Sequence, residues 1–380
     1  MLQEVFLTLL IISALYFAVK IANVFVKLKI ENVKYPAIDG VRGYLGFFVF
    51  LHHAYIWNHY LKYHIWENPK SNFFNHLGQT SVALFFIITS FLFTTKLLTS
   101  KKAAFDWKKY IISRLYRLTP IYLFTISFFL IIVGVLTNFE MRDTLQNNIK
   151  NCLSWIFFSV SGPVNINLLT DTSKINAGVT WTLPYEWMFY LLLPIIGLFY
   201  KVKVDFKTLI IFSFLFVLIF HLNNSVVENF IPFIGGIVCA MVLNNPKIKI
   251  NWSHYKFAIL GIIVLILSVV SFNSGKKIIP IIVSTFLLLL IAHGNSFFGV
   301  LTTPFSRKFG QITYSFYLIH GLILFVLFRF VIGYKIAAQL SELNYWGCIA
   351  LSLIPIIFIS QLTFKYIELP FMHFKNKKTQ

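Results

Sequence analysis

Several ionisable side chains of this sequence lie within or beside long apolar runs, where each is costly unless it is paired or hydrated. Asp39, Arg42 and His53 form the first group. On an α-helix, the step from Arg42 to His53 gives about 16 Å of rise and leaves both side chains within about 20° of one face. Asp39 precedes Arg42 by one turn and can neutralise it. Snorkelling to lipid phosphates is the simpler interpretation of Arg42 alone, and the alignment with His53 shifts the balance modestly toward function.

A second group, Arg114 and Arg117, has the spacing that places two guanidinium groups on one helix face. Anchoring at the cytoplasmic boundary is the simpler interpretation of this pair. The functional alternative is a clamp for the phosphates of a cytoplasmic ligand, because guanidinium binds phosphate bidentately.

A third group combines the carboxylate of Glu186 with the aromatic rings of Trp181 and Tyr185. The rings are compatible with an ordinary aromatic belt at the membrane interface. Aromatic rings also stack on sugar rings, and Glu186 could bind a hydroxyl group. The sequence favours neither of these two interpretations over the other.

Further ionisable residues carry weaker signals. Tyr314, Ser315 and His320 lie together in an apolar run, whereas Glu368 precedes a proline and is expected to have a structural role. Three histidines are expected to be solvated in an exposed loop, namely His59, His64 and His76. No two histidines have a convincing metal spacing, so no metal site is expected. The three cysteines are far apart and receive no role.

The composition identifies the elements that must position these residues. Of 380 residues, 58% are hydrophobic and only 12% are charged, against roughly 25% charged in soluble domains. Such a chain cannot cover a soluble surface, so the sequence predicts an all-α polytopic membrane protein. Eleven helices are expected at about 5–26, 43–60, 79–96, 117–137, 180–200, 208–222, 229–244, 257–273, 278–293, 312–333 and 345–366. A shorter apolar stretch at 152–160 is expected to be interfacial or re-entrant.

The net charge of +20 follows from the same architecture. With the N-terminus outside, 23 Lys and Arg residues fall in cytoplasmic segments and eight fall in outer ones. Positive charge accumulates on the cytoplasmic side of membrane proteins, so this orientation is predicted, with Gln380 inside. The excess of basic residues therefore has a topological cause, and no nucleic acid partner is expected.

Taken together, these clusters resemble the acyltransferase 3 family of integral membrane O-acyltransferases. The opening motif of that family matches Asp39 to Gly43 and is followed by a histidine with the spacing of His53. Ser90 replaces the glycine of a second motif. The other motifs match at residues 114–117, 181–186, 314–320 and 368–370. The resemblance implies a ten-helix acyltransferase domain at 35–374, preceded by an extra helix with a cytoplasmic linker at 1–34 and followed by a basic tail at 375–380.

The resemblance further implies transfer of an acyl group, usually acetyl, from cytoplasmic acyl-CoA to a hydroxyl of a cell-surface or lipid-linked glycan. Acetyl-CoA would be a co-substrate, with no permanently bound cofactor, and the bacterial cytoplasmic membrane is the expected location. His53 is the candidate base, or the carrier of the acetyl group, and Glu186 is the second catalytic candidate. Arg42, Arg114 and Arg117 are candidates for binding the CoA moiety. The acceptor candidates are Trp181, Tyr185, Tyr314, Ser315 and His320.

Two other classes of function are compatible with intramembrane Arg, His and Glu. A transporter or flippase of a glycolipid or small solute would use the same residue types, but the sequence has no clear internal repeat. A membrane scaffold without catalysis would not explain five ionisable clusters.

Overall fold

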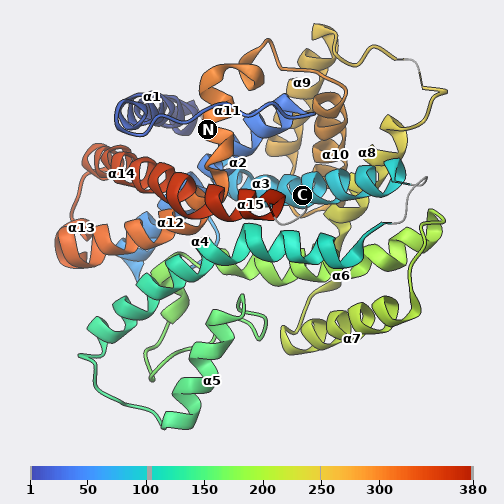
Figure 1. The fold of residues 1–380 in the computed structure, drawn as a ribbon. Coiled ribbons are helices and arrows are strands. Elements are labelled where there is room, and N and C mark those ends of the chain that lie inside the picture. The colour runs from blue at the N-terminus through green and yellow to red at the C-terminus, as the bar shows by residue number, and fades with distance from the viewer. Residues whose placement is uncertain (1, 101–104, 249, 378–380) are drawn as a thin grey trace. The chain divides into compact units, whose positions relative to one another are not determined.

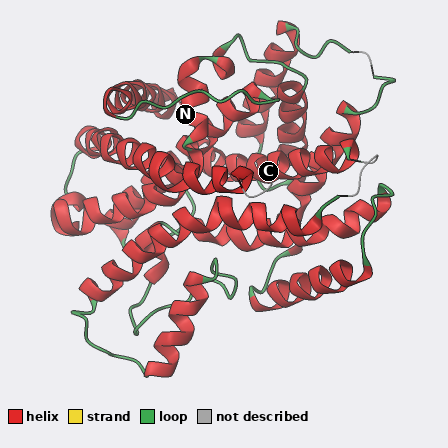
Figure 2. Ribbon diagram, viewed as in Figure 1, coloured by secondary structure: helices red, strands yellow, loops and turns green. Residues whose placement is uncertain are grey.

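The computed structural model describes residues 2–100, 105–248 and 250–377, and all regular structure in these ranges is helical (Figures 1 and 2). The predicted all-α fold is therefore confirmed. The end of the predicted basic tail, at 378–380, lies outside the described residues.

Eleven long or medium helices correspond to the eleven that the sequence predicts. They are α1 (Leu2–Phe25), α2 (Pro36–Tyr63), α3 (Asn72–Thr99), α4 (Trp107–Leu136), α6 (Leu183–Phe199), α7 (Phe206–Leu222), α8 (Ile231–Leu243), α9 (Tyr255–Ser271), α10 (Ile278–Ala292), α12 (Thr313–Val326) and α14 (Glu342–Thr363). Shorter helices are α5 (Leu145–Ile156), α11 (Pro304–Gln311), α13 (Tyr334–Ala338) and α15 (Leu369–Lys377). The 3-10 turns are η1 (Thr172–Asn176), η2 (Val179–Thr182), η3 (Val227–Phe230) and η4 (Val300–Thr302), and the π-helical turns are η5 (Leu327–Val331) and η6 (Phe364–Glu368).

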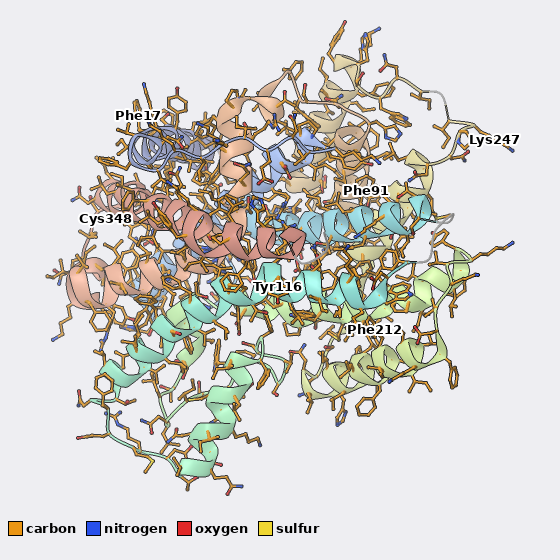
Figure 3. All side chains as sticks on the ribbon, in the orientation of Figure 1. Phe17, Phe91, Tyr116, Phe212, Lys247 and Cys348 are labelled. Carbon is orange, nitrogen blue, oxygen red and sulfur yellow. The ribbon has the colours of Figure 1, made fainter. Side chains whose placement is uncertain are left out.

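The helices are long and apolar enough to form a multi-pass membrane protein. Among the residues that the structure describes, six candidate spans meet the length and composition of a membrane crossing, and four further apolar helices are shorter. Apolar side chains cover the outer surfaces of these helices: Phe17 of α1 is 60% exposed, and α7 has no buried residue (Figure 3). A helix surface of this kind is suited to contact with lipid tails rather than with water.

The chain forms two compact units, which are described separately. Unit 1 consists of Met1–Ile88 and Asn245–Phe364, and unit 2 consists of Thr89–Asn244 and Lys365–Gln380. The segment that holds Arg42 and His53 belongs to unit 1, whereas Arg114, Arg117 and Glu186 belong to unit 2.

In unit 1, a stripe of glycines brings α2 close to its neighbours. Gly40 lies against Leu301 of η4, Gly43 against the backbone nitrogen of Gly310 in α11, and Gly46 against Thr313 of α12. A Cβ atom at Gly40 would collide with backbone, so the close approach requires glycine at this position. The stripe fixes how α2 passes α12, and thereby which residues of the two helices meet.

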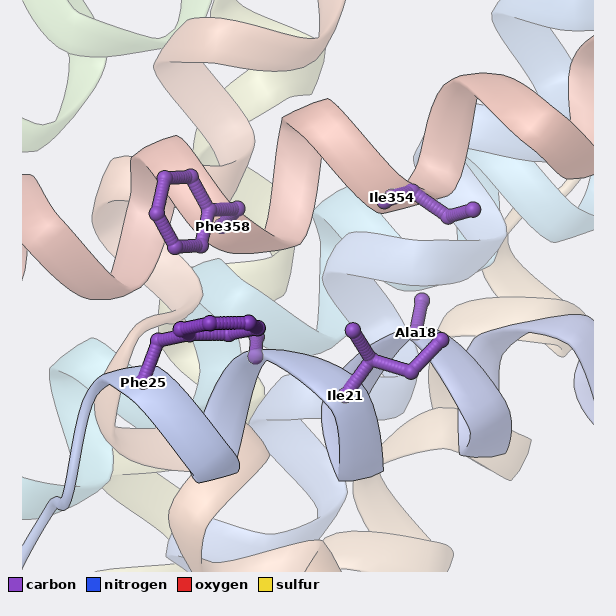
Figure 4. Close-up of a pocket in the computed structure, with 6 residues that line it drawn as sticks. Ala18, Ile21, Phe25, Ile354 and Phe358 are labelled. Carbon is purple, nitrogen blue, oxygen red and sulfur yellow. The ribbon is translucent and has the colours of Figure 1, made fainter.

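The helix that precedes the family-like segment also packs within unit 1. Helix α1 lies along α14, where Ala18, Ile21 and Phe25 of α1 face Ile354 and Phe358 of α14 (Figure 4). These side chains line an apolar groove of about 160 Å³.

The start of α3 differs from the sequence prediction. The sequence predicts a helix from 79 and a solvated loop before it, but α3 begins at Asn72, and His76 is only 3% exposed. The imidazole of His76 hydrogen-bonds the carbonyl of Phe272 (2.7 Å), and the amide of Asn75 donates to the carbonyl of Asn273 (2.6 Å). These partners come from a segment that is distant in the sequence, so the prediction that His76 is solvated is wrong.

In unit 2, α4 begins ten residues before its predicted start. The carboxylate of Asp106 accepts a hydrogen bond from the backbone N–H of Lys109 (2.8 Å) and caps the helix at Trp107. Arg114 and Arg117 therefore lie in its second and third turns rather than at its end.

The long segment between α4 and α6 contains the short helix α5. Its Leu145, Ile149 and Leu153 are exposed at a spacing of four residues, and its other side is rich in Asn and Gln. An amphipathic helix of this kind suits the plane of a membrane interface, which favours the interfacial alternative over the re-entrant one. The side chain of Asn167 organises this segment, because its oxygen accepts from the backbone N–H of Arg142 (2.7 Å) and its nitrogen donates to the carbonyl of Glu140 (2.7 Å).

Candidate active site

Two histidines from different helices meet in unit 1. Nδ1 of His53, on α2, lies 3.0 Å from Nε2 of His320, on α12. The two rings are stacked, with centroids 5.2 Å apart and planes at 22°. His320 is fully buried and His53 is half-buried. The sequence selects both residues but gives no indication that they are in contact.

The hydrogen bonds of His320 indicate where its proton lies. Its Nδ1 is 3.1 Å from the carbonyl oxygen of Phe316, which can only accept. His320 therefore carries its proton on Nδ1, and its Nε2 accepts the hydrogen bond from Nδ1–H of His53. In this assignment, which follows from the hydrogen-bond pattern, Nε2 of His53 retains a lone pair. The arrangement fixes the tautomer that a general base requires.

The neighbouring His52 has a different environment. It is buried, and its Nδ1 lies 2.9 Å from the carbonyl oxygen of Phe74 in α3. The imidazole ring occupies the space beside Gly78, where any Cβ atom would collide with it. His52 therefore joins α2 to α3, whereas His53 points to α12.

The arginine of the first group lies near the start of α2. Nη1 of Arg42 is 3.8 Å from Oδ1 of Asp39, one turn earlier, so the predicted pairing of these two residues is present. Both side chains are half-buried. The helix thus carries a partly neutralised guanidinium near one end and the histidine pair about three turns later.

The serine in the apolar run of Tyr314, Ser315 and His320 is engaged within the protein. Ser315 is fully buried, and its Oγ accepts a hydrogen bond from Thr363 of α14 (3.0 Å). Tyr314 is half-buried beside it. Ser315 joins α12 to α14 and thereby supports the helix that carries His320.

In unit 2, Arg114 and Glu186 are connected through one tyrosine. The hydroxyl of Tyr190, on α6, donates to Oε2 of Glu186 (3.3 Å), and Tyr190 interacts electrostatically with the guanidinium of Arg114 of α4. The guanidinium of Arg114 also lies over the ring of Phe93, 4.9 Å from its centroid. The sequence assigns Arg114 to the donor and Glu186 to the acceptor, but the structure places both beside Tyr190.

Aromatic rings enclose this cluster. The rings of Tyr190 and Tyr110 both contact Phe93 edge-on, with centroids 5.3 and 5.4 Å away. Arg117, one turn beyond Arg114 on α4, is half-buried. The sequence motifs do not select Tyr190. Its position four residues after Glu186 on the same helix is a signal that could have identified it.

The two other aromatic candidates of unit 2 lie at the start of α6. Trp181 contacts Tyr185 edge-on at 5.9 Å, and the hydroxyl of Tyr185 accepts from the backbone N–H of Val226 (2.9 Å). Tyr185 is buried, and this hydrogen bond attaches the start of α6 to the segment before α8.

The part of the chain that the structure describes contains no group of three His, Cys, Asp or Glu side chains arranged to hold a metal ion. The titratable groups instead pair within each unit: His53 is hydrogen-bonded to His320 in unit 1, and Tyr190 is hydrogen-bonded to Glu186 in unit 2.

A comparison with family models identifies the family of the chain. The model described as an acyltransferase domain, of the acyltransferase 3 family, matches residues 35–364. The chain belongs to this family. Neither the curated proteins nor the solved structures include a significant match to it.

As a member of the acyltransferase 3 family, the protein is a multi-pass membrane acyltransferase. The match contains both histidines of the pair and the whole Arg114–Tyr190–Glu186 cluster. Helix α1 lies outside the match.

Proposed function

We propose that this acyltransferase moves an acetyl group from cytoplasmic acetyl-CoA to a hydroxyl of a cell-surface or lipid-linked glycan. The observation that carries the proposal is the hydrogen bond between His53 and His320. A sugar hydroxyl is a weak nucleophile at neutral pH and needs a base within hydrogen-bond reach. The pair supplies an imidazole whose tautomer is fixed. This imidazole belongs to His53, the histidine that matches the family motif.

The proposed chemistry follows from the tautomer. Nε2 of His53 takes the proton of the acceptor hydroxyl while the hydroxyl oxygen attacks the thioester carbon. The new C–O bond forms and the C–S bond breaks. The proton then passes from His53 to the sulfur of CoA, so the base is regenerated. His320 accepts the hydrogen bond from Nδ1–H throughout and stabilises the transient imidazolium of His53.

The alternative route uses the same nitrogen as a nucleophile. Nε2 of His53 would then attack the thioester carbon, so that the C–S bond breaks and CoA leaves as the thiolate. The acceptor hydroxyl would next take the acetyl group from Nε2, and its proton would pass to the thiolate. The hydrogen bond to His320 serves either route, because it keeps the lone pair on Nε2 of His53.

Arginines are the proposed contacts for the donor. Arg42 and Arg117 are half-buried on helices whose charge pattern predicts cytoplasmic ends. A guanidinium group fits the phosphates of CoA because it donates two parallel hydrogen bonds. Arg114 would act on the donor and on Glu186 at once, since its guanidinium interacts electrostatically with Tyr190.

Glu186 is the proposed contact for a hydroxyl of the acceptor, with Trp181 at a sugar ring. Tyr185 and Ser315 would act indirectly, because hydrogen bonds within the protein engage their hydroxyls. A glycan acceptor and a bacterial cytoplasmic membrane fit the predicted outer position of the α6 start.

Mass spectrometry of cell-surface glycans tests the proposal. Cells that express the protein should carry O-acetyl esters that are absent from cells without it and from cells with His53→Ala. Consumption of labelled acetyl-CoA by the protein without formation of any glycan ester would contradict the proposed class of acceptor. Equal ester content with and without the protein would contradict the function.

A further inference from the structure

A cavity of about 680 Å³ lies in unit 1, where the start of α1, the end of α2 and the start of α14 meet. Its lining includes Glu4 of α1, Tyr55, Asn58 and Lys62 of α2, and Glu342 of α14. The volume is in the range of small-ligand sites, roughly 300–1,000 Å³. The family match begins at residue 35, so the wall that α1 contributes lies outside the matched residues.

The cavity is separate from the histidine pair. Tyr55, Asn58, His59 and Lys62 recur at the spacing that forms one stripe on α2. Tyr55 follows His53 by two residues, which turns its side chain by about 200° from that of His53. A ligand in this cavity therefore contacts the side of α2 that faces away from the reacting nitrogen.

The charges of the cavity exclude a polyphosphate ligand. The carboxylates of Glu4 and Glu342 both act electrostatically on Tyr55. Glu67, in the adjoining loop, is paired with His59 (3.1 Å) and with Lys70 (3.8 Å). Acidic and basic groups thus nearly balance here, whereas the phosphates of CoA require an excess of cations.

Polar groups face the cavity without internal partners. Within the described ranges, the side chains of Asn58, Lys62 and Glu342 form no hydrogen bond or ion pair. An amide, an ammonium and a carboxylate together offer both donors and acceptors, which is the requirement for recognising several hydroxyl groups. A hydrocarbon chain would leave these groups unsatisfied, unlike the apolar groove between α1 and α14 (Figure 4).

Aromatic rings complete the lining. The ring of Tyr55 packs against Phe74 at 4.7 Å, and Phe74 stacks on Trp346 at 5.5 Å. Tyr63 lies at the rim, where its ring contacts His59 at 4.8 Å. Flat rings beside hydrogen-bonding groups match a sugar, which presents apolar C–H faces and polar edges.

We propose that this outer cavity binds a saccharide segment of the acceptor that lies apart from the hydroxyl that is acetylated. The proposal rests on the proposed function and specifies how the acceptor is held. The cavity joins the first residues of α1 and α14 to the last turn of α2, which the charge distribution predicts to lie outside. A distal sugar bound there keeps a polymeric or lipid-linked acceptor close to the site, and α1 contributes to its selection.

Three variants test the cavity. Asn58→Trp fills it, the double variant Lys62→Gln with Glu342→Gln removes two charges without adding bulk, and Leu343→Trp places the same indole ring at an exposed neighbour outside the lining. Each purified protein is assayed for acetyl-CoA affinity, and cells that express it are assayed for glycan O-acetyl esters by mass spectrometry.

The expected result is a loss of glycan esters of at least about tenfold in Asn58→Trp and a smaller loss in the double variant, both with acetyl-CoA affinity within about twofold of wild type. Leu343→Trp should match wild type in both assays. Wild-type ester levels in both cavity variants would overturn the proposal and leave the proposed function intact. A parallel loss of acetyl-CoA affinity in both would also overturn it, because the cavity would then serve the donor or the fold. Absence of esters in wild-type cells would overturn the proposed function, and this proposal with it.

Discussion

Nδ1 of His53 and Nε2 of His320 lie 3.0 Å apart, although 267 positions separate the two residues in the sequence. Because the other nitrogen of His320 is bound to the carbonyl of Phe316, the direction of the hydrogen bond between the imidazoles is set. His320 is therefore a positioning residue for His53, comparable to the group that orients the histidine of a hydrolase triad. The glycine stripe of α2 makes this approach possible.

Replacement of His320 should separate positioning from packing. His320→Phe keeps the ring volume but cannot accept the hydrogen bond from Nδ1–H of His53, so we expect the transfer rate to fall by about 10–10²-fold. His320→Gln offers an amide oxygen and should recover part of that loss. The transfer rate and the acetyl-CoA affinity of purified protein are measured, and the affinity should not change. Equal rates in the two variants would show that His320 only fills space.

Replacement of the two adjacent histidines should give opposite outcomes. His53→Ala should lower transfer by about 10²–10⁴-fold with little loss of protein from the membrane. His52→Ala should retain most of the activity but lose about 1 kcal/mol of stability, because the bond to the Phe74 carbonyl is removed. Transfer assays and thermal unfolding in detergent distinguish these effects. Equal loss of activity in both variants would contradict the assignment of His53.

The orientation of the chain is a separate expectation. Reporter fusions at the two ends should give opposite localisation, with Met1 outside and Gln380 in the cytoplasm, because the Lys and Arg residues concentrate on one side. A cytoplasmic signal from both ends would mean that α1 does not cross the membrane.

The sequence predicts the helices well, because apolar runs of this length have few alternatives to a membrane span. It fails at polar helix ends: Asn75 and His76 resemble loop residues because their partners, Phe272 and Asn273, come from a distant segment. Residue types identify His53 and His320 as candidates, but their contact depends on helix packing.

Arginine-to-lysine substitutions in α4 should test the donor contacts. Lysine keeps the charge but lacks the planar fork that binds phosphate. Arg117→Lys should weaken acetyl-CoA binding by about tenfold or less with little effect on the rate at saturation. Arg114→Lys should weaken binding and also lower the saturated rate, since the guanidinium of Arg114 interacts electrostatically with Tyr190. Titration with acetyl-CoA measures the affinity, and steady-state kinetics measure the rate at saturation. Wild-type affinity in both variants would remove these arginines from the donor site.

The link between Tyr190 and Glu186 can be tested with a double-mutant cycle. Tyr190→Phe removes only the hydroxyl, so the packing of the ring against Phe93 is retained. Each of Tyr190→Phe and Glu186→Gln should lower transfer, and the two losses should not add, because one hydrogen bond joins the two groups. Contacting residues typically show coupling of about 0.5–3 kcal/mol.

A matched control is Tyr185→Phe, because the hydroxyl of Tyr185 binds the backbone N–H of Val226 instead of Glu186. Its effect should add to that of Glu186→Gln. Transfer rates of purified proteins at saturating acetyl-CoA provide the measurement. Additive losses for Tyr190→Phe and Glu186→Gln would show that the bridge between Arg114 and Glu186 has no part in catalysis.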